Sequence, residues 1–202
     1  MFITLEGGEG AGKTTQARCL AARLRGAGCQ VLETREPGGA PGAERLRALL
    51  LSGEIAWSLP AETLLHFAAR AEHVERTIRP ALTAGMVVVC DRFADSTMAY
   101  QGYAQGGDRR AIATLTDMLA IRPDLTLLLD LDVPTGLARL AARGAPADRY
   151  ERLGADFFAR VRDGFRAIAA ADPARCVVIA AAEAPALIAD RIWAVVQARR
   201  TP

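Results

Sequence analysis

The eight residues from Gly7 to Thr14 constrain this chain more than any other part of its sequence. They fit the pattern G-x-x-x-x-G-K-[ST], directly after an apolar run and directly before a helical stretch. Glycines at this spacing let successive backbone N–H groups turn toward one anion, and the N-terminus of the next helix adds favourable potential. The segment therefore predicts a phosphate-binding loop between a strand and a helix of an α/β fold.

The loop supplies the candidate residues for binding a nucleoside triphosphate. These are Gly7, Gly8, Glu9, Gly10, Ala11, Gly12, Lys13, Thr14 and Thr15. Lys13 is predicted to reach the β- and γ-phosphates, and Thr14 to ligate Mg²⁺ through its hydroxyl. Lys13 is also the only lysine in a chain with 25 basic residues. The motif indicates the phosphate donor but leaves the acceptor open.

Five short apolar runs are predicted to be buried parallel strands. They are Phe2–Leu5, Val31–Thr34, Met86–Cys90, Leu125–Leu131 and Cys176–Ile179. They lack strict alternation, as expected when helices cover both faces of a sheet. The predicted helices are Lys13–Gly26, Pro41–Leu51, Pro60–Ala84, Arg109–Ile121, Pro134–Ala142, Ala155–Ala170 and Ala184–Arg199. Pro80 should kink or divide the third. We expect a three-layer α/β fold with a five-stranded parallel sheet.

Composition narrows the class of protein. No repeat or linker divides the 202 residues, so one domain spanning 1–202 is expected. A formal net charge of +2 offers no basic excess for nucleic acid, and the apolar runs are too short to cross a membrane. The first residues show no targeting segment, which favours the cytoplasm.

A carboxylate follows the third apolar run. Asp91 lies at the carboxyl end of that predicted strand, the edge where such sheets carry metal ligands. With Thr14, it forms the candidate Mg²⁺ site. The alternative, that Asp91 caps the following helix, stays open. The neighbouring Arg92 is suited to bidentate binding of a phosphate.

Several segments together resemble bacterial thymidylate kinases. They are Glu6–Thr15, Thr34–Gly39, Phe67–Arg70, Asp91–Phe93, Ser96–Gly102 and Arg122–Thr126. The likeness runs from Met1 to about Ala182 and is most specific in the Arg-Glu-Pro-Gly-Gly and Asp-Arg-Phe segments. It implies a P-loop NTPase fold, ATP and Mg²⁺ as cofactors, and phosphorylation of dTMP to dTDP. It also implies a homodimer, for which the apolar helices after Pro60 and Asp91 are candidate interfaces.

The resemblance also implies the residues that bind the acceptor. They are Glu9, Glu36, Arg47, His66, Arg70, Arg92, Ser96, Thr97, Tyr100 and Gln101. Arg70 is expected to hydrogen-bond the thymine carbonyl, with a place on a solvent-exposed helix face as the alternative. Arg47 and Arg92 are expected to hold the monophosphate. Ser96, Thr97 and Gln101 would form a polar wall along the pyrimidine.

Three of these positions keep an alternative or depart from the family. Tyr100 would pack beside C2′ of the sugar, although plain core packing explains it as well. Glu9 would point away from the donor, toward the 3′-hydroxyl. His66 stands where the family usually has a phenylalanine stacked on thymine, and an imidazole offers less stacking area. Glu36 either joins the metal or acceptor network or shapes the Pro37-Gly38-Gly39 turn.

The segment 143–151 resembles the arginine-bearing lid of the bacterial enzymes. Arg149 is the first candidate to reach the transferring phosphoryl group and Arg143 the second, since such arginines stabilise charge on the equatorial oxygens. A basic surface loop is the alternative. The full set of candidate catalytic residues is Lys13, Asp91, Arg92, Arg143 and Arg149.

Other functions remain open from the sequence. The nearest is another small-molecule P-loop kinase, such as a deoxynucleoside kinase or a different nucleoside monophosphate kinase. Arg47 and Arg92 favour an acceptor that already carries a phosphate. A sugar or shikimate kinase needs an Asp at the acceptor hydroxyl, and Asp91 would serve. A regulatory NTPase is expected to show a switch segment, which the sequence does not display.

Overall fold

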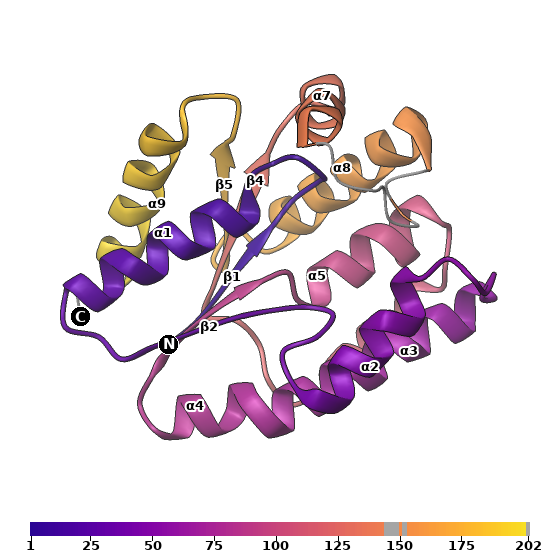
Figure 1. Ribbon diagram of the computed structural model, residues 1–202, viewed down its shortest axis with the longest axis horizontal. Helices are drawn as coiled ribbons and strands as arrows, with labels where there is room; N and C mark the ends of the chain where they lie inside the picture. The colour runs from indigo at the N-terminus through magenta and orange to yellow at the C-terminus, as the bar shows by residue number, and fades with distance from the viewer. Residues whose placement is uncertain (144–149, 151–152, 201–202) are drawn as a thin grey trace.

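The structure is a computed structural model that describes residues 1–143, 150 and 153–200, apart from the side chain of Arg143. Its sheet has five parallel strands, as the sequence predicts. They are β1 (Phe2–Glu6), β2 (Val31–Arg35), β3 (Val87–Asp91), β4 (Leu125–Asp130) and β5 (Cys176–Ala180). Their order is β2-β3-β1-β4-β5, so β1 is central (Figure 1). Ile3 pairs with Val89 on one side and with Leu125 on the other.

Helices connect the strands. They are α1 (Lys13–Gly26), α2 (Pro41–Leu51), α3 (Leu59–His73), α4 (Arg79–Thr83), α5 (Ala94–Thr97), α6 (Arg109–Met118), α7 (Val133–Arg143), α8 (Gly154–Ala171) and α9 (Pro185–Arg200). Two π-helical segments, η1 (Val74–Ile78) and η2 (Met98–Ala104), continue α3 and α5. The predicted α1 and α2 have the observed bounds, whereas α6 ends at Met118 rather than at Ile121.

Pro80 accounts for the π-helical segment η1, whose turn is wider than that of an α-helix. A proline has no backbone N–H, so the helical hydrogen bond to the carbonyl four residues earlier is missing. The segment η1 lies directly before this position, and α4 then continues the helix. The predicted division therefore takes the form of a π-helical turn within a continuing helix.

Alternating side chains of β1 serve two separate cores. Ile3 and Leu5 pack with residues of α1 and α9, which lie side by side on one face of the sheet (Figure 1). Phe2 faces the other way and packs edge-on against Phe93, with ring centroids 5.0 Å apart. Each such buried side chain contributes about 1.5–3 kcal/mol. These two cores hold the two faces of the sheet between helices. The carboxyl ends of the strands are left available to form a pocket.

No helix in the described part of the chain combines the length and the apolar character needed to cross a membrane.

Candidate active site

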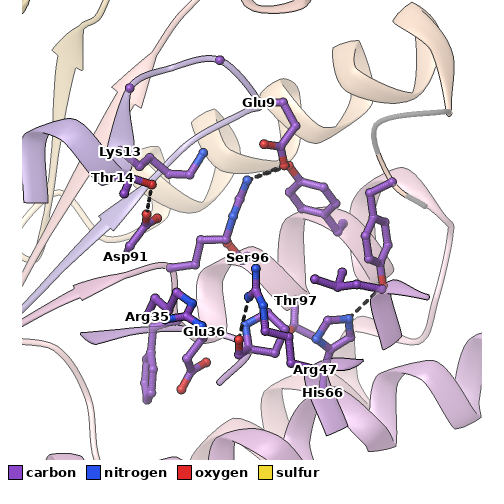
Figure 2. Close-up of a pocket in the computed structure, with 18 of the residues that line it drawn as sticks. Glu9, Lys13, Thr14, Arg35, Glu36, Arg47, His66, Asp91, Ser96 and Thr97 are labelled. Carbon is purple, nitrogen blue, oxygen red and sulfur yellow. Dashed lines mark hydrogen bonds and ion pairs between the residues drawn. The ribbon is translucent and has the colours of Figure 1, made fainter. Parts of the chain in front are cut away.

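A pocket of about 620 Å³ lies at the carboxyl edge of the sheet. Sixteen of the predicted site residues line it: Glu9, Gly10, Gly12, Lys13, Thr14, Thr15, Glu36, Arg47, His66, Arg70, Asp91, Arg92, Ser96, Thr97, Tyr100 and Gln101. Lys13, Thr14 and Asp91 gather at one end, and Arg47, Thr97 and His66 at the other (Figure 2). Gly7, Gly8 and Ala11 do not line it. Arg149 and the Arg143 side chain lie outside the described residues.

The shape of the phosphate loop depends on bare backbone at two glycines. Gly7 has φ 139°, and a Cβ there would meet the carbonyl oxygen of Leu129 at 2.4 Å. Gly10 has φ 69°, and a Cβ there would meet the carbonyl oxygen of Gly136 in α7 at 2.3 Å. Only glycine combines positive φ with this close approach. The loop is thereby held against β4 and α7.

Lys13 folds back over the loop. Its Nζ donates to the carbonyl oxygen of Gly8 at 2.7 Å, and the residue is only 7% exposed. Burial, followed by the charge of Arg92, lowers the pKa of Lys13 to about 8, although Glu9 and Asp91 act in the opposite direction. A bound phosphate would favour the charged form further, because an anion beside an ammonium raises its pKa.

The two predicted metal ligands are in direct contact. The Thr14 hydroxyl donates to Oδ2 of Asp91 at 2.5 Å, and both side chains face the pocket (Figure 2). Asp91 ends β3, whereas α5 begins at Ala94 with Phe93 as its N-cap. The alternative that Asp91 caps the next helix is therefore wrong.

Arg92 occupies an unusual backbone conformation. Its φ is 71°, in the left-handed region that a residue with a Cβ rarely adopts. Its side chain donates to the carbonyl oxygen of Gly7 at 3.1 Å, to Ser96 Oγ at 3.2 Å and to Glu9 Oε1 at 2.5 Å. Burial disfavours its charge, but Glu9, Tyr100 and Asp91 outweigh burial and raise its pKa above the ordinary value. The guanidinium is thus fixed in its charged form.

The Glu9 side chain points toward Arg92 and Tyr100. Its Oε1 accepts from the Tyr100 hydroxyl at 2.8 Å as well as from Arg92. The Tyr100 ring also packs edge-on against Phe157 and Phe165. The core-packing interpretation of Tyr100 is therefore confirmed for its ring, and the residue also lines the pocket.

Arg70 is held almost completely buried at 2% exposure. Its Nε donates to Glu36 Oε2 at 2.6 Å, and its Nη2 donates to the carbonyl oxygen of Phe93 at 3.1 Å and to Thr97 Oγ1 at 3.0 Å. Its Nη1 finds no hydrogen-bond partner among the described residues, although Arg70 lines the pocket. The solvent-exposed face that the sequence left open for Arg70 is therefore wrong.

Glu36 orients Arg70 with the help of a residue that the sequence did not single out. His73 is fully buried, and its Nδ1 lies 3.1 Å from Glu36 Oε1. Its Nε2 lies 2.7 Å from Thr34 Oγ1. Because the carboxylate only accepts, Nδ1 is the donor to Glu36. His73 follows Arg70 by three residues, a spacing that places both on one helix face.

His66 is anchored by a second buried network. Its Nε2 lies 2.9 Å from the Tyr150 hydroxyl, which donates to Glu62 Oε1 at 2.9 Å. Since Tyr150 has one hydroxyl proton, Nε2 of His66 is the donor in their hydrogen bond. Gln101 also donates to Glu62 Oε1, at 2.8 Å. The amide of Gln101 thus supports the wall behind the pocket rather than only facing it.

The remaining arginines of the pocket come from different elements. Arg47 on α2 donates to the carbonyl oxygen of Pro37 at 2.7 Å. Arg139 on α7, which the sequence did not single out, donates to the carbonyl oxygen of Ala181 at 3.0 Å, within 3.4 Å of Gly10. Arg35 at the end of β2 pairs with the exposed Glu44. No local pattern marks Arg139, because its position depends on the packing of α7 beside the loop.

The chain is similar to known proteins over nearly its whole length. The model of the Thymidylate kinase family matches residues 5–192. A thymidylate kinase of Gluconobacter oxydans is 54% identical over 189 residues, with 92% of this chain and 88% of the relative covered. One of Synechococcus is 53% identical over 201 residues, with 98% and 95% covered.

A solved structure supports the same conclusion at the level of the whole fold. The crystal structure of thymidylate kinase from Ehrlichia chaffeensis superposes with a TM-score of 0.79 at 38% identity, and 98% of each chain is covered. The family match over nearly the full length, the phosphate loop and the adjoining pocket all agree. The chain belongs to the thymidylate kinase family.

Proposed function

We propose that this member of the family transfers the terminal phosphoryl group of ATP to dTMP and forms dTDP in the pocket described above. The observation that carries the proposal is the division of one pocket into two ends. Lys13, Thr14 and Asp91 form the donor end, and Arg70 lies buried at the other with an unpartnered Nη1. A nucleotide kinase needs such a site, because both substrates must meet with their phosphates in line.

Mg²⁺ fits the donor end by its chemistry. Thr14 and Asp91 offer a hydroxyl and a carboxylate in mutual contact, and Mg²⁺ prefers oxygen ligands with few from the protein. These two residues would hold the ion. When bound, it supplies positive charge that neutralises the β- and γ-phosphates. Lys13 would turn from Gly8 to the same phosphates, and the loop N–H groups would bind them.

The acceptor phosphate is assigned to Arg92 and Arg47. Both line the pocket, one directly after β3 and the other on α2. Guanidinium groups bind phosphate with paired hydrogen bonds, so two of them favour an acceptor that already carries a phosphate. The attacking atom is then an ionised phosphate oxygen, and the reaction needs no general base. This favours a monophosphate over a sugar or shikimate.

The base is assigned to Arg70, with His66 beside it. Nη1 of Arg70 is a buried donor that remains unsatisfied among the described residues, and leaving such a donor unpaired costs about 1–3 kcal/mol. A carbonyl oxygen of thymine would satisfy it. His66 offers an aromatic face held in place by Tyr150. Thr97 supports Arg70 rather than reading the base by itself.

The sugar is assigned to Glu9 and Tyr100. Both residues line the pocket, and the Tyr100 hydroxyl donates a hydrogen bond to Glu9. A carboxylate there suits a 3′-hydroxyl as a partner. The rigid Tyr100 ring leaves less room for an additional 2′-hydroxyl. We extend the proposal to a single cytoplasmic domain that works as a homodimer.

An acceptor panel tests the proposal. ADP release is measured with ATP and Mg²⁺ in the presence of dTMP, dUMP, CMP, AMP, thymidine or shikimate. Strong turnover with dTMP, with dUMP slower, is expected. Turnover with thymidine but not dTMP would point instead to a deoxynucleoside kinase. ADP release at the acceptor-free rate throughout the panel would contradict the acceptor assignment and favour a regulatory NTPase.

A further inference from the structure

Glu6 is a buried carboxylate for which the assignments above have no use. It ends β1 directly before Gly7 and is only 1% exposed. Side chains alternate along a strand, so Glu6 lies on the same side of β1 as Phe2, whose core includes Phe93 and Ala94. The Glu6 carboxylate therefore points toward the turn between β3 and α5, and away from α1.

Both carboxylate oxygens bind that turn. Oε1 accepts the backbone N–H of Phe93 at 2.7 Å, and Oε2 accepts the hydroxyl of Ser96 at 2.6 Å. Arg92 directly precedes Phe93 and has the left-handed φ of 71°. Such a conformation persists in a residue with a Cβ only where neighbouring contacts hold it. The two hydrogen bonds to Glu6 are contacts of this kind.

Ser96 connects Glu6 to the Arg92 side chain. Its hydroxyl donates to Glu6 and accepts from Arg92 Nη1 at 3.2 Å. The backbone N–H of Arg92 also donates to the carbonyl oxygen of Leu5, the residue before Glu6. The backbone and the side chain of Arg92 are thus both tied to the end of β1, from which the phosphate loop begins.

A carboxylate is a costly residue at this position. Burial, reinforced by the charge of Asp95, raises the pKa of Glu6 to about 8. An apolar side chain of similar size is often no less stabilising than a buried charged group. The presence of a carboxyl group here therefore indicates that its two hydrogen bonds have a role in positioning the turn that carries Arg92.

We propose that Glu6 is a positioning residue that holds the Arg92 turn and thereby sets the acceptor-binding arginine relative to the donor loop. A single side chain then connects the donor loop to the acceptor-binding arginine. Glu6 directly precedes Gly7, and it binds both Phe93, which follows Arg92, and Ser96, which accepts a hydrogen bond from the Arg92 guanidinium. The inference rests on the proposed function, in which Arg92 holds the phosphate of dTMP. Glu6 itself touches neither substrate.

Steady-state kinetics of Glu6→Val test this role. The variant leaves the Phe93 N–H and the Ser96 hydroxyl without their acceptor, so the Arg92 turn relaxes. We expect the KM for dTMP to rise about tenfold or more, with the KM for ATP changed by less than about threefold. Glu6→Gln still offers an oxygen to Phe93 and a hydrogen bond to Ser96, and it should restore the KM for dTMP to within about threefold of the wild type.

Thr4→Val is the matched control. Thr4 is fully buried on the same face of β1, and its hydroxyl bonds Thr126 at 2.8 Å. This variant also removes a buried hydrogen bond, but one in which Arg92, Phe93 and Ser96 take no part, and both KM values should stay unchanged. Equal shifts of both KM values in Glu6→Val would overturn the proposal. Glu6→Gln as damaging as Glu6→Val would do the same, because charge rather than hydrogen bonding would then matter.

Two further measurements separate the outcomes. If Glu6→Val does not fold, Glu6→Asp keeps the carboxyl group but shortens the side chain by one methylene, which draws both oxygens away from Phe93 and Ser96, and a selective rise of about threefold in the KM for dTMP is expected. No selectivity in that variant would contradict the role of Glu6. Wild-type turnover with dTMP is measured in the same assay. Its absence would contradict the proposed function, whereas unselective Glu6 variants of an active enzyme would contradict only this inference.

Discussion

Thr14 donates a 2.5 Å hydrogen bond to Oδ2 of Asp91, so the first turn of α1 and the end of β3 meet at two side-chain oxygens that are candidate metal ligands. This contact leads to the first prediction. Asp91→Asn keeps the size of the side chain but removes the charge that a divalent ion would share. We expect turnover to fall by about 10²-fold or more and the Mg²⁺ concentration for half-maximal rate to rise. Titrating Mg²⁺ at saturating ATP measures both.

Asp117→Asn is the control for Asp91→Asn. Asp117 forms an exposed ion pair with Arg122, far along the chain from the loop, and its variant should keep the wild-type Mg²⁺ dependence. An Asp91→Asn enzyme with normal turnover and normal Mg²⁺ dependence would remove Asp91 from the metal site.

Lys13→Ala should abolish turnover but leave dTMP binding nearly intact. The ammonium lies at the donor end, where it meets charge that develops on the phosphoryl group in the transition state. We expect kcat to fall by about 10²–10³-fold or more. Calorimetric titration with dTMP in the absence of ATP should give a dissociation constant within about threefold of the wild type. A comparable loss of dTMP affinity would show that Lys13 shapes the acceptor end too.

Arg70→Ala should weaken dTMP far more than ATP. The variant removes the buried Nη1 donor, and a hydrogen bond from a charged group contributes about 1.5–3 kcal/mol, or roughly 10–100-fold in affinity. It also removes one of the two partners of the buried Glu36 carboxylate and leaves the hydrogen bond from His73, so the free energy of unfolding should fall. Arg76→Ala, on an exposed face one helical segment away, is the control. Equal losses for both nucleotides would count against base reading by Arg70.

His66→Phe tests how the base is stacked. A phenyl ring offers more stacking area, and an aromatic pair adds about 0.5–1.5 kcal/mol, so we expect the KM for dTMP to fall about two- to tenfold. Tyr150 keeps its hydrogen bond to Glu62 in this variant. A higher KM would mean that the hydrogen bond from His66 to Tyr150 matters more than the ring area. The KM for ATP serves as the internal reference.

Stability should depend on pH through Glu6. Its pKa is raised from 4.5 to about 8 in the folded state by burial and then by Asp95, with Arg92 acting in the opposite direction. Between these values the folded state binds more protons than the unfolded state, so this group's contribution is fully present below about pH 4.5 and is lost as the pH rises through about 8. Denaturant unfolding of the wild type and of Glu6→Gln at pH 5, 7 and 9 measures it. A difference between the two proteins that does not change with pH would contradict the raised pKa.

Structural features that are determined by residues close together in the chain were predictable from the sequence. The phosphate loop is one example, because its glycines, Lys13 and the helix that follows act over a single turn of chain. The five strands are another, since uninterrupted apolar runs mark a sheet covered on both faces. Asp91 was predictable by its place at a strand end. The strand order was not, because pairing depends on how the connecting helices pack.

Residues that act through distant partners were not predictable. Glu6 is 87 positions from its partner Phe93, and His73 is 37 positions from Glu36. No pattern around either residue marks these contacts, and a buried histidine is as consistent with ordinary packing. In the sequence, Tyr150 stood out only as part of the segment that resembles a lid. In the structure its hydroxyl bonds His66, a residue 84 positions earlier in the chain. Such roles exist only once the fold has brought the partners together.

The contact between Gly10 and Gly136 has a consequence for how this loop can change. A Cβ at Gly136 would meet the carbonyl oxygen of Glu9 at 2.6 Å, just as one at Gly10 would meet the backbone of α7. The backbone shape of the phosphate loop therefore depends on two chain segments, the loop itself and α7, which pack directly against each other. Grafted alone onto another scaffold, the eight-residue motif would lack the wall that shapes it, and a protein engineer would have to transfer both glycines together.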